Sequence, residues 1–292
     1  MKVSGSIDVI LPAKNEAGTI QQVVSELVKI GFVNEVLVID DGSSDDTATK
    51  AKLAGARVIC HPYSKGNGAA IKTGILSARS ELIVMMDADG QHSPSDIKTL
   101  FSHLESGGYD MVVGARSKSG QANYHRHLAN EIYNFLASKI TEQKILDLTS
   151  GFRIVKRLKA LEFLELLPNK FSYPTTLTMA FFRAGYSVGY YPISVKKRTG
   201  KSHLNPIKDG IRFLLIIFKV ATLYSPLKVF FPISISFLLM GSVYAIYTLI
   251  EMGRFTNMSA LLLTTGVIIF LIGLISEQVT SLIYISLGRK RE

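Results

Sequence analysis

The sequence predicts a mostly parallel α/β domain, followed by an interfacial helix and two transmembrane helices. Short runs rich in Val, Ile and Leu alternate with helical patterns until about Ile193, as expected for a parallel sheet covered on both faces. Two long uncharged segments, 229–250 and 255–276, lie near the end of the chain. The hydrophobic fraction of 47% is high because these apolar residues concentrate after about Ile211. The chain therefore has two parts.

Strands and helices are predicted in strict alternation along the first part. The strands are expected at 7–13, 35–40, 57–61, 81–87 and 110–116, and the helices at 16–31, 44–55, 66–79 and 93–107. In the first helix, apolar residues from Ile20 to Val28 recur at helical spacing before Gly31. The second opens with capping residues and closes on a glycine. A further helix at 171–185 is either core or a wall of the site.

The last third of the chain predicts a hairpin of two transmembrane helices. A bilayer core needs about 20 helical residues, and each uncharged segment supplies them. Two buried core helices are the alternative, but neither segment has a polar face to show water. Basic residues flank both spans outside the hairpin turn, so the chain before Lys228 and both termini are expected in the cytoplasm; these residues are Lys208, Arg212, Lys219, Lys228, Arg289, Lys290 and Arg291.

The segment 205–228 predicts an interfacial helix ahead of the first span. Ile211, Leu214, Leu215 and Phe218 fall on one face, and basic residues are spaced to meet lipid phosphates. An ordinary amphipathic core helix is the other interpretation. Glu277 lies inside the second span, close enough to the cytoplasmic end to need no special role.

Charge and cysteine content exclude several classes. The net charge of +10 fits either nucleic acid or an anionic membrane surface. Many basic residues cluster beside the spans, which favours the membrane and argues against a nucleic-acid partner. The single cysteine, Cys60, cannot form an internal disulfide. The first residues lack a long apolar stretch, so no cleavable signal peptide is expected.

Polar residues gather where the five predicted strands end. They are Pro12 to Glu16, Asp40 to Ser44, Lys65 to Gly68, Asp87 to Gln91, and Arg116. Ligands of open parallel sheets bind outside the carboxyl ends of the strands, so these residues predict one binding site. Helix capping alone would hardly put polar residues at all five ends.

Asp87 and Asp89 are the strongest candidates for chemistry. If the strand continues, their side chains point the same way, and two close carboxylates repel each other unless a cation lies between them. Mg²⁺ or Mn²⁺ takes oxygen ligands and bridges to phosphates, and Gln91 could add an amide oxygen. Capping the next helix is the alternative, but Ser93 suits that role better. Glu16 and Asp41 could bind a ribose hydroxyl or a base N–H.

Two nucleotide-binding motifs are missing. No G-x-G-x-x-G follows the first strand, which argues against a nicotinamide cofactor. The stretch "RTGKS" resembles the end of a P-loop, but Val195 occupies the position of the first glycine and no strand–helix context surrounds it. An NTPase is therefore excluded.

The motifs "LPAKNE", "IDDGSSDDT", "MDADGQH" and "DLTSGFR", followed by a basic loop and two spans, resemble the family 2 glycosyltransferases. More narrowly they are similar to the branch that moves a sugar from a nucleotide onto a polyprenyl phosphate: the dolichyl-phosphate mannose synthases and their undecaprenyl-phosphate relatives. The resemblance implies a GT-A (Rossmann-like) fold, an inverting mechanism and a donor held by Mg²⁺ or Mn²⁺. It also implies a UDP- or GDP-linked sugar donor, a polyprenyl-phosphate acceptor and membrane lipid as partners.

The resemblance also assigns residues. Pro12, Glu16, Ile39 and Asp41 would hold the nucleoside; Asp87, Ala88, Asp89 and Gln91 match the metal and diphosphate site; Arg116 matches an arginine that meets phosphate. In the acceptor loop "KKRTGKSH", the side chain that binds the acceptor phosphate is one of Lys197, Arg198, Lys201 and His203. We expect Arg198 to bind this phosphate, with support from Lys201. Lys14 stands where mannose synthases usually have tyrosine, so the base and sugar stay open.

The expected organisation is a catalytic domain at 1–200, a basic loop with a juxtamembrane helix at 201–226, and a hairpin at 227–292. The expected location is a bacterial or archaeal plasma membrane, and the oligomeric state is open between a monomer and a homo-oligomer. Asp147 either serves as a base or positions the sugar, or it is a cap or turn residue. Transfer to another lipid or to a polysaccharide, and a catalytically silent scaffold, are the alternatives; the absence of tryptophan argues against a processive synthase with a Gln-x-x-Arg-Trp motif.

Overall fold

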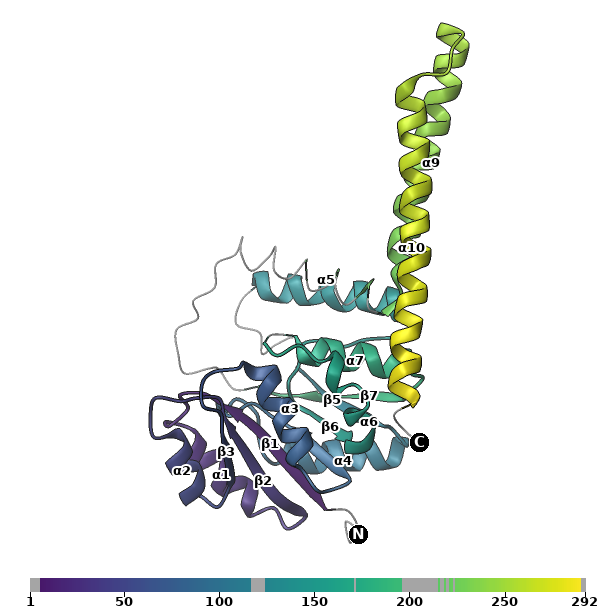
Figure 1. The fold of residues 1–292 in the computed structure, drawn as a ribbon. Helices are drawn as coiled ribbons and strands as arrows, with labels where there is room; N and C mark the ends of the chain where they lie inside the picture. The colour runs from purple at the N-terminus through teal and green to yellow at the C-terminus, as the bar shows by residue number, and fades with distance from the viewer. Residues whose placement is uncertain are drawn as a thin grey trace. The chain divides into compact units, whose positions relative to one another are not determined.

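The computed structural model describes residues 6–116, 124–170, 172–195, 215, 218, 221–222 and 224–289. The chain divides into two compact units, Met1–Asn205 and Pro206–Glu292, and each is described here by itself (Figure 1). Most of the predicted interfacial helix, and all of the predicted acceptor loop 196–203, fall outside the described residues.

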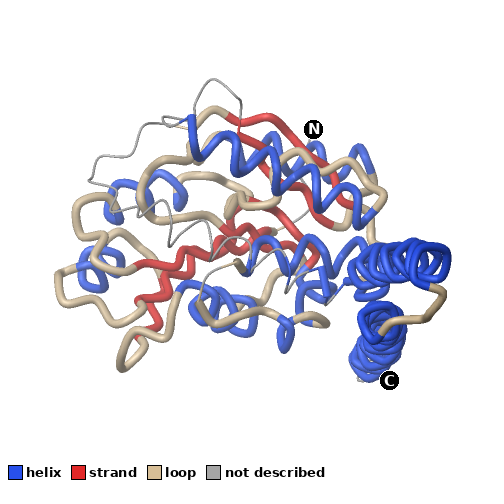
Figure 2. The backbone as a smooth tube through the Cα atoms, turned by 90° about the horizontal axis from the view of Figure 1, so that it is seen from above, coloured by secondary structure: helices blue, strands red, loops and turns tan. Residues whose placement is uncertain are grey.

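A seven-stranded sheet forms the centre of the first unit (Figure 2). Its order is β3-β2-β1-β4-β6-β5-β7. β6 runs antiparallel to β4 and β5, and the other neighbours are parallel. The strands are β1 (Ile7–Ala13), β2 (Val33–Asp40), β3 (Arg57–Cys60), β4 (Leu82–Met85), β5 (Met111–Arg116), β6 (Arg153–Lys156) and β7 (Val188–Ile193). The prediction of a mostly parallel α/β domain is confirmed.

Helices cover both faces of the sheet. They are α1 (Ile20–Val28), α2 (Thr47–Leu53), α3 (Asn67–Ser77), α4 (Asp96–Gly107), α5 (Tyr124–Thr141), α6 (Arg157–Leu161), a short 3₁₀ helix η2 (Leu164–Leu166) and α7 (Tyr173–Arg183). Apolar residues of α1, α2 and α4 pack in one cluster against alternate residues of β1, β2 and β4, such as Val9 and Leu11. On the other face, α3 packs so closely that a Cβ at Gly74 would lie 2.3 Å from the Ile10 side chain.

β6 and β7 were not predicted as strands. β6 has four residues, of which two are charged, so it offers too short an apolar run to stand out. β7, "VGYYPI", carries a proline, which lowers a strand prediction except at a sheet edge, and β7 is an edge strand. α7 was predicted as a helix; its residues from Tyr173 to Phe181 are all buried, so it contributes mainly to the core.

A buried acid just before β5 binds lysines of β6 and α6, at the end of the strands opposite the polar strand ends. Asp110 binds the ammonium groups of Lys156 at 3.0 Å and Lys159 at 2.7 Å. Burial acts to raise the pKa of Asp110, but the hydrogen bonds from Lys159 and Lys156 outweigh it and lower the pKa to about 2. This carboxylate therefore stabilises the fold at neutral pH.

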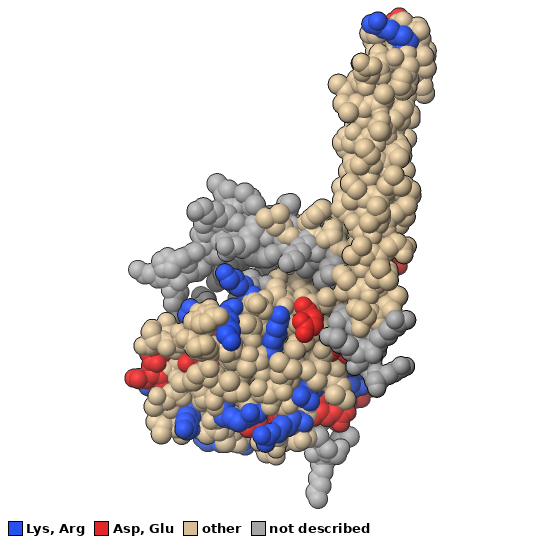
Figure 3. Space-filling model, viewed as in Figure 1, with Lys and Arg blue, Asp and Glu red and all other residues tan. Residues whose placement is uncertain are grey.

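The second unit contains a hairpin of two long apolar helices, α9 (Pro226–Met252) and α10 (Asn257–Arg289). Both are long and apolar enough to cross a membrane, with mean hydropathy 2.0 for Pro226–Met252 and 2.5 for Asn257–Ser286. Only 17% of each apolar window is buried, unlike the core helices of a soluble protein. On the face shown in Figure 3, patches of charged residues are scattered over the first unit, whereas the hairpin shows hardly any charge between its two ends.

Small residues and one acid hold the hairpin together. A Cβ at Gly241 would lie 3.0 Å from Leu263, and one at Gly266 would lie 2.7 Å from Leu238, so the two backbones approach closely. Glu277 of α10 accepts a hydrogen bond from the backbone N–H of Leu227 at 3.2 Å, which satisfies a donor in the first turn of α9. Glu277 therefore has a structural role within the hairpin.

Candidate active site

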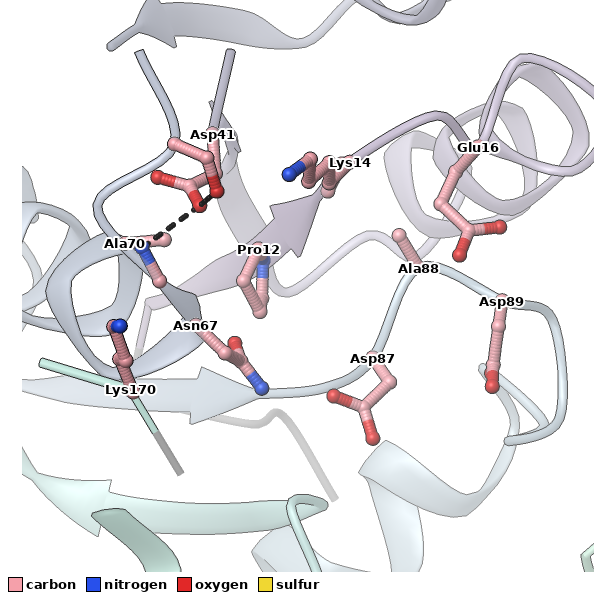
Figure 4. A pocket seen from close by; sticks show the side chains of 13 residues that line it. Pro12, Lys14, Glu16, Asp41, Asn67, Ala70, Asp87, Ala88, Asp89 and Lys170 are labelled. Carbon is pink, nitrogen blue, oxygen red and sulfur yellow. Dashed lines mark hydrogen bonds between the residues drawn. The ribbon is translucent and has the colours of Figure 1, made fainter. Parts of the chain in front are cut away.

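The carboxyl ends of β1, β2 and β4 border a pocket of about 630 Å³, a usual size for a ligand site. Its lining residues are Pro12, Ala13, Lys14, Glu16, Asp41, Ser64, Gly66, Asn67, Ala70, Asp87, Ala88, Asp89 and Lys170 (Figure 4). Six of the residues predicted from sequence are among them: Pro12, Glu16, Asp41, Asp87, Ala88 and Asp89. The structure thus brings the polar ends of four of the five predicted strands together.

Three other predicted residues do not line this pocket. Ile39 is completely buried in β2. Gln91 follows the acid pair and donates its backbone N–H to Asp89 Oδ1 at 3.1 Å. Arg116 ends β5 and binds Asp147. The predicted acceptor cations Lys197, Arg198, Lys201 and His203 lie outside the described residues.

Asp87 and Asp89 sit directly beyond the end of β4, and both are partly exposed. Ala88 between them is buried, and its carbonyl accepts a hydrogen bond from Thr19 Oγ1 at 2.9 Å, which fixes the loop. Figure 4 shows both carboxylates turned toward the same side of the loop. This arrangement provides two adjacent anionic oxygen donors.

The surroundings of Asp87 fit a divalent cation. A Cβ at Gly151 would lie 3.1 Å from Asp87 Oδ2 and 3.4 Å from Oδ1, so any side chain there would press on the carboxylate. Among the described residues, no group of three or more His, Cys, Asp or Glu side chains could hold a metal by itself. Mg²⁺ characteristically binds through one or two carboxylates and completes its ligands with phosphates and water. The donor set of Asp87 and Asp89 therefore suits an ion that arrives with a diphosphate.

Asp41 has its carboxylate oxygens fully engaged by the protein. Oδ1 pairs with His61 Nδ1 at 2.8 Å and accepts the N–H of Lys65 at 2.8 Å. Oδ2 accepts the Ser64 hydroxyl at 2.7 Å and the N–H of Gly66 at 2.9 Å. Burial acts to raise the pKa of Asp41, but the bonds from His61, Ser64 and the two N–H groups outweigh it and lower the pKa. Asp41 therefore shapes the loop at 61–66, one wall of the pocket.

Arg116 and Asp147 form a two-point ion pair beside the acid pair. Arg116 Nε lies 2.8 Å from Asp147 Oδ2, and Nη2 lies 2.9 Å from Oδ1. Burial acts to raise the pKa of Asp147, but the hydrogen bonds and charge of Arg116 outweigh it and lower the pKa. Asp147 also accepts the N–H groups of Thr149 and Ser150, each at 3.1 Å. These bonds favour the turn-residue interpretation of Asp147, and they anchor the Arg116 guanidinium.

A buried cation and a buried histidine underlie the site. Arg153 is fully buried; it donates to the carbonyls of Ser150 and Pro174 and to Thr178, and it makes no ion pair with the described residues. His92 stacks on Phe152 with ring centroids 5.0 Å apart. Burial lowers the pKa of His92 to about 4, so the ring is neutral at pH 7.

Lys14, Asn67 and Lys170 all line the pocket. Sequence reasoning placed Lys14 and Asn67 in the polar strand ends but gave neither a role, and it did not place Lys170 in the site at all. Asn67 had a signal, because the polar run Lys65 to Gly68 ends a predicted strand. Lys14 lies within the "LPAKNE" motif itself. Lys170 had no such signal in the sequence, because it lies about 80 residues beyond Asp89, in a loop that contains no recognisable motif.

Comparisons with known proteins agree with this geometry. The AglJ glycosyltransferase of Haloferax volcanii is 29% identical over 257 residues, which cover 86% of this chain and 84% of that protein. The CsbB protein of Bacillus subtilis is 29% identical over 302 residues, which cover 96% of this chain and 88% of that protein. Both alignments extend well beyond the pocket.

The fold also matches solved structures. Glucosyl-3-phosphoglycerate synthase from Mycobacterium tuberculosis, solved with Mn²⁺ and UDP-glucose, aligns with a TM-score of 0.60 and 24% identity, covering 74% of this chain and 78% of that one. At this identity the likeness shows the fold alone. The predicted GT-A arrangement is thereby confirmed.

Family models match both parts of the chain. Residues 225–282 match the GtrB C-terminal hairpin, which agrees with the two apolar helices. Residues 8–162, more than half of the chain, match the model of glycosyl transferase family 2. The chain belongs to glycosyl transferase family 2.

Proposed function

We propose that this protein transfers a sugar, with inversion, from a UDP- or GDP-linked donor to a polyprenyl phosphate at the cytoplasmic face of a membrane. The observation that carries the proposal is that one chain joins an acid pair at the end of β4 to an apolar hairpin. A transferase with a water-soluble acceptor would not need the hairpin.

On the donor side, Asp87 and Asp89, with Gln91 as a further ligand, would hold Mg²⁺ or Mn²⁺. The ion supplies charge neutralisation for the diphosphate that leaves the sugar. Pro12, Glu16 and Asp41 would contact the nucleoside, since all three line the pocket, with Glu16 on the side of the acid pair where the ribose joins the diphosphate. The related fold that binds Mn²⁺ and UDP-glucose supports this assignment.

On the acceptor side, a phosphate monoester is already an anion and needs no strong general base. Its oxygen attacks the anomeric carbon from the face opposite the diphosphate, and the bond from that carbon to the diphosphate oxygen breaks. Arg116, held by Asp147, would share the negative charge near the acid pair. Arg198, supported by Lys201, would meet the acceptor phosphate.

The hairpin would insert with both of its ends on the cytoplasmic side, so that the catalytic unit meets the lipid phosphate at headgroup height. The basic residues before α9 and after α10 support this orientation. The match of residues 225–282 to the GtrB C-terminal hairpin supports anchoring in a membrane, which in a bacterium or an archaeon would be the plasma membrane.

The test uses full-length protein in detergent, a panel of UDP- and GDP-sugars and undecaprenyl phosphate, with Mn²⁺ or with EDTA. Metal-dependent formation of a glycosylated lipid phosphate is the expected result, and Asp89→Ala is the inactive control. Transfer only to another lipid or to a polysaccharide would replace the acceptor assignment. Nucleotide binding without any transfer would indicate a silent scaffold.

A further inference from the structure

The loop 168–170 forms a wall of the pocket because glycines let it dock on the start of α3. Gly68 donates its N–H to the Lys170 carbonyl at 3.1 Å, and Ala69 donates to the Asn169 carbonyl at 2.8 Å. A Cβ at Gly66 would lie 2.6 Å from the Asn169 oxygen, and one at Gly68 would lie 1.9 Å from the Pro168 oxygen. Larger residues at either position would push the loop away.

This docking determines which ligand group the helix can meet. The first N–H groups of a helix are a common phosphate site, but here two of them already donate to loop carbonyls. The diphosphate of a donor is therefore left to the other end of the pocket, where Asp87 and Asp89 can hold it with a divalent ion.

The pocket consequently has two chemically different ends. Figure 4 shows Asp87, Asp89 and Glu16 at one end, and Lys170 and Asp41 at the other. With the diphosphate at the acid end, a nucleoside in this pocket extends toward Lys170. The nucleobase end is then the end that Lys170 borders.

The groups available at the nucleobase end are mostly hydrogen-bond donors. Asp41 lies there, but its two oxygens already accept four hydrogen bonds, which is about the capacity of a carboxylate. Lys170 and Asn67 make no side-chain hydrogen bond with any residue in the described ranges. Lysine offers three donors and no acceptor, whereas an asparagine amide offers both.

We propose, building on the proposed donor class, that Lys170 reads the nucleobase by donating a hydrogen bond to its exocyclic oxygen. Uracil O4 and guanine O6 are acceptors next to a ring N–H, which the Asn67 side-chain oxygen can accept. Cytosine and adenine carry an amino group at the corresponding position, so two donors would face each other. Lys170 is thus a specificity-determining residue that selects oxo bases over amino bases.

The experiment measures binding of UDP, GDP, CDP and ADP to the full-length protein in detergent with Mn²⁺, by isothermal titration calorimetry. The wild type is expected to bind its better oxo-base diphosphate at least about tenfold more tightly than CDP or ADP. Lys170→Met keeps the length of the side chain but removes its donors, and should bring this ratio close to one. Lys98→Met removes a charge from an exposed lysine of α4 that does not line the pocket, and should leave the ratio unchanged.

The outcomes separate this inference from the proposed function. If Lys170→Met retains the wild-type ratio, or the wild type shows no preference, the role of Lys170 is overturned while donor binding stands. If Lys14→Met abolishes the ratio and Lys170→Met does not, the reading residue is Lys14. If none of the four diphosphates binds, both the inference and the proposed function fail. If the ratio behaves as expected but no sugar reaches a lipid phosphate, only the acceptor assignment fails.

Discussion

The substitution Gly68→Ala tests whether the contact between α3 and the loop 168–170 builds the pocket. The added Cβ would lie 1.9 Å from the Pro168 oxygen, a distance no real contact allows, so the loop must move. Movement breaks the hydrogen bonds from Gly68 and Ala69, which contribute about 1 kcal/mol each. Residual strain adds about 1 kcal/mol or more. The better helix propensity of alanine offsets up to about 1 kcal/mol.

The net loss is therefore about 2–3 kcal/mol in the free energy of unfolding of the first unit. For a domain of this size, each kcal/mol shifts Tm by about 2–4 °C, so we expect a fall of about 4–12 °C. Because the loop carries Lys170, affinity for UDP or GDP should fall as well. Thermal unfolding in detergent and nucleotide titration measure the two effects.

Gly18→Ala is the matched control, because a Cβ at Gly18 would meet nothing within 4 Å. It should change neither Tm nor nucleotide affinity appreciably. If Gly68→Ala behaves like Gly18→Ala in both measurements, the loop does not depend on the absence of side chains at α3, and the reasoning is refuted.

Three further predictions concern the metal, acid stability and the hairpin. Asp89→Ala should abolish Mn²⁺ binding in the presence of UDP, measured by electron paramagnetic resonance, and should leave Tm nearly unchanged. The control variant Asp96→Ala, on α4, should bind Mn²⁺ normally. Equal Mn²⁺ binding by the two variants would contradict the metal assignment. Asp110→Asn should lose about 2 kcal/mol of stability at pH 7, because the folded pKa of about 2 lies below the ordinary 3.8. This stabilisation is complete above about pH 4 and disappears as the pH falls through 2, so denaturant curves of wild type and variant should converge there; a constant gap would be the contrary result. A chain that ends before Leu227 should still bind UDP or GDP but glycosylate lipid phosphate at least about tenfold more slowly in vesicles, since the acceptor must then be found from solution; undiminished transfer would show that the hairpin is not needed.

The elements with strong local patterns could be predicted from the sequence. Strands β1 to β5 have apolar runs long enough to show against their flanks, and the polar residues after β1, β2 and β4 line one pocket as expected. The uncharged segments of α9 and α10 predicted the hairpin, because helices of such apolar composition are not expected to lie exposed to water. In these places the local pattern and the final structure agree.

The features that depend on tertiary contacts could not be predicted. β6 is a strand because β4 and β5 flank it on both sides, although its four residues carry little strand signal of their own. Lys170 reaches the pocket only because Gly66 and Gly68 admit its loop, a relationship across about 100 residues of chain. The assignment of Asp41 to the nucleoside stays a prediction, since its oxygens also hold the loop at 61–66.

The ion pair between Arg116 and Asp147 has a consequence for how this enzyme could diversify. The chain leaves the sheet at Arg116, the last residue of β5, and Asp147 binds back to Arg116 before the chain re-enters the sheet at β6. One ion pair therefore joins the two ends of the segment 117–146. A segment closed in this way can change in length or composition while the strands beneath keep their register, because loop-closure cost grows only slowly with length. We therefore expect the segment 117–146 to differ most, in length and sequence, between relatives that use the same sugar donor but different acceptors.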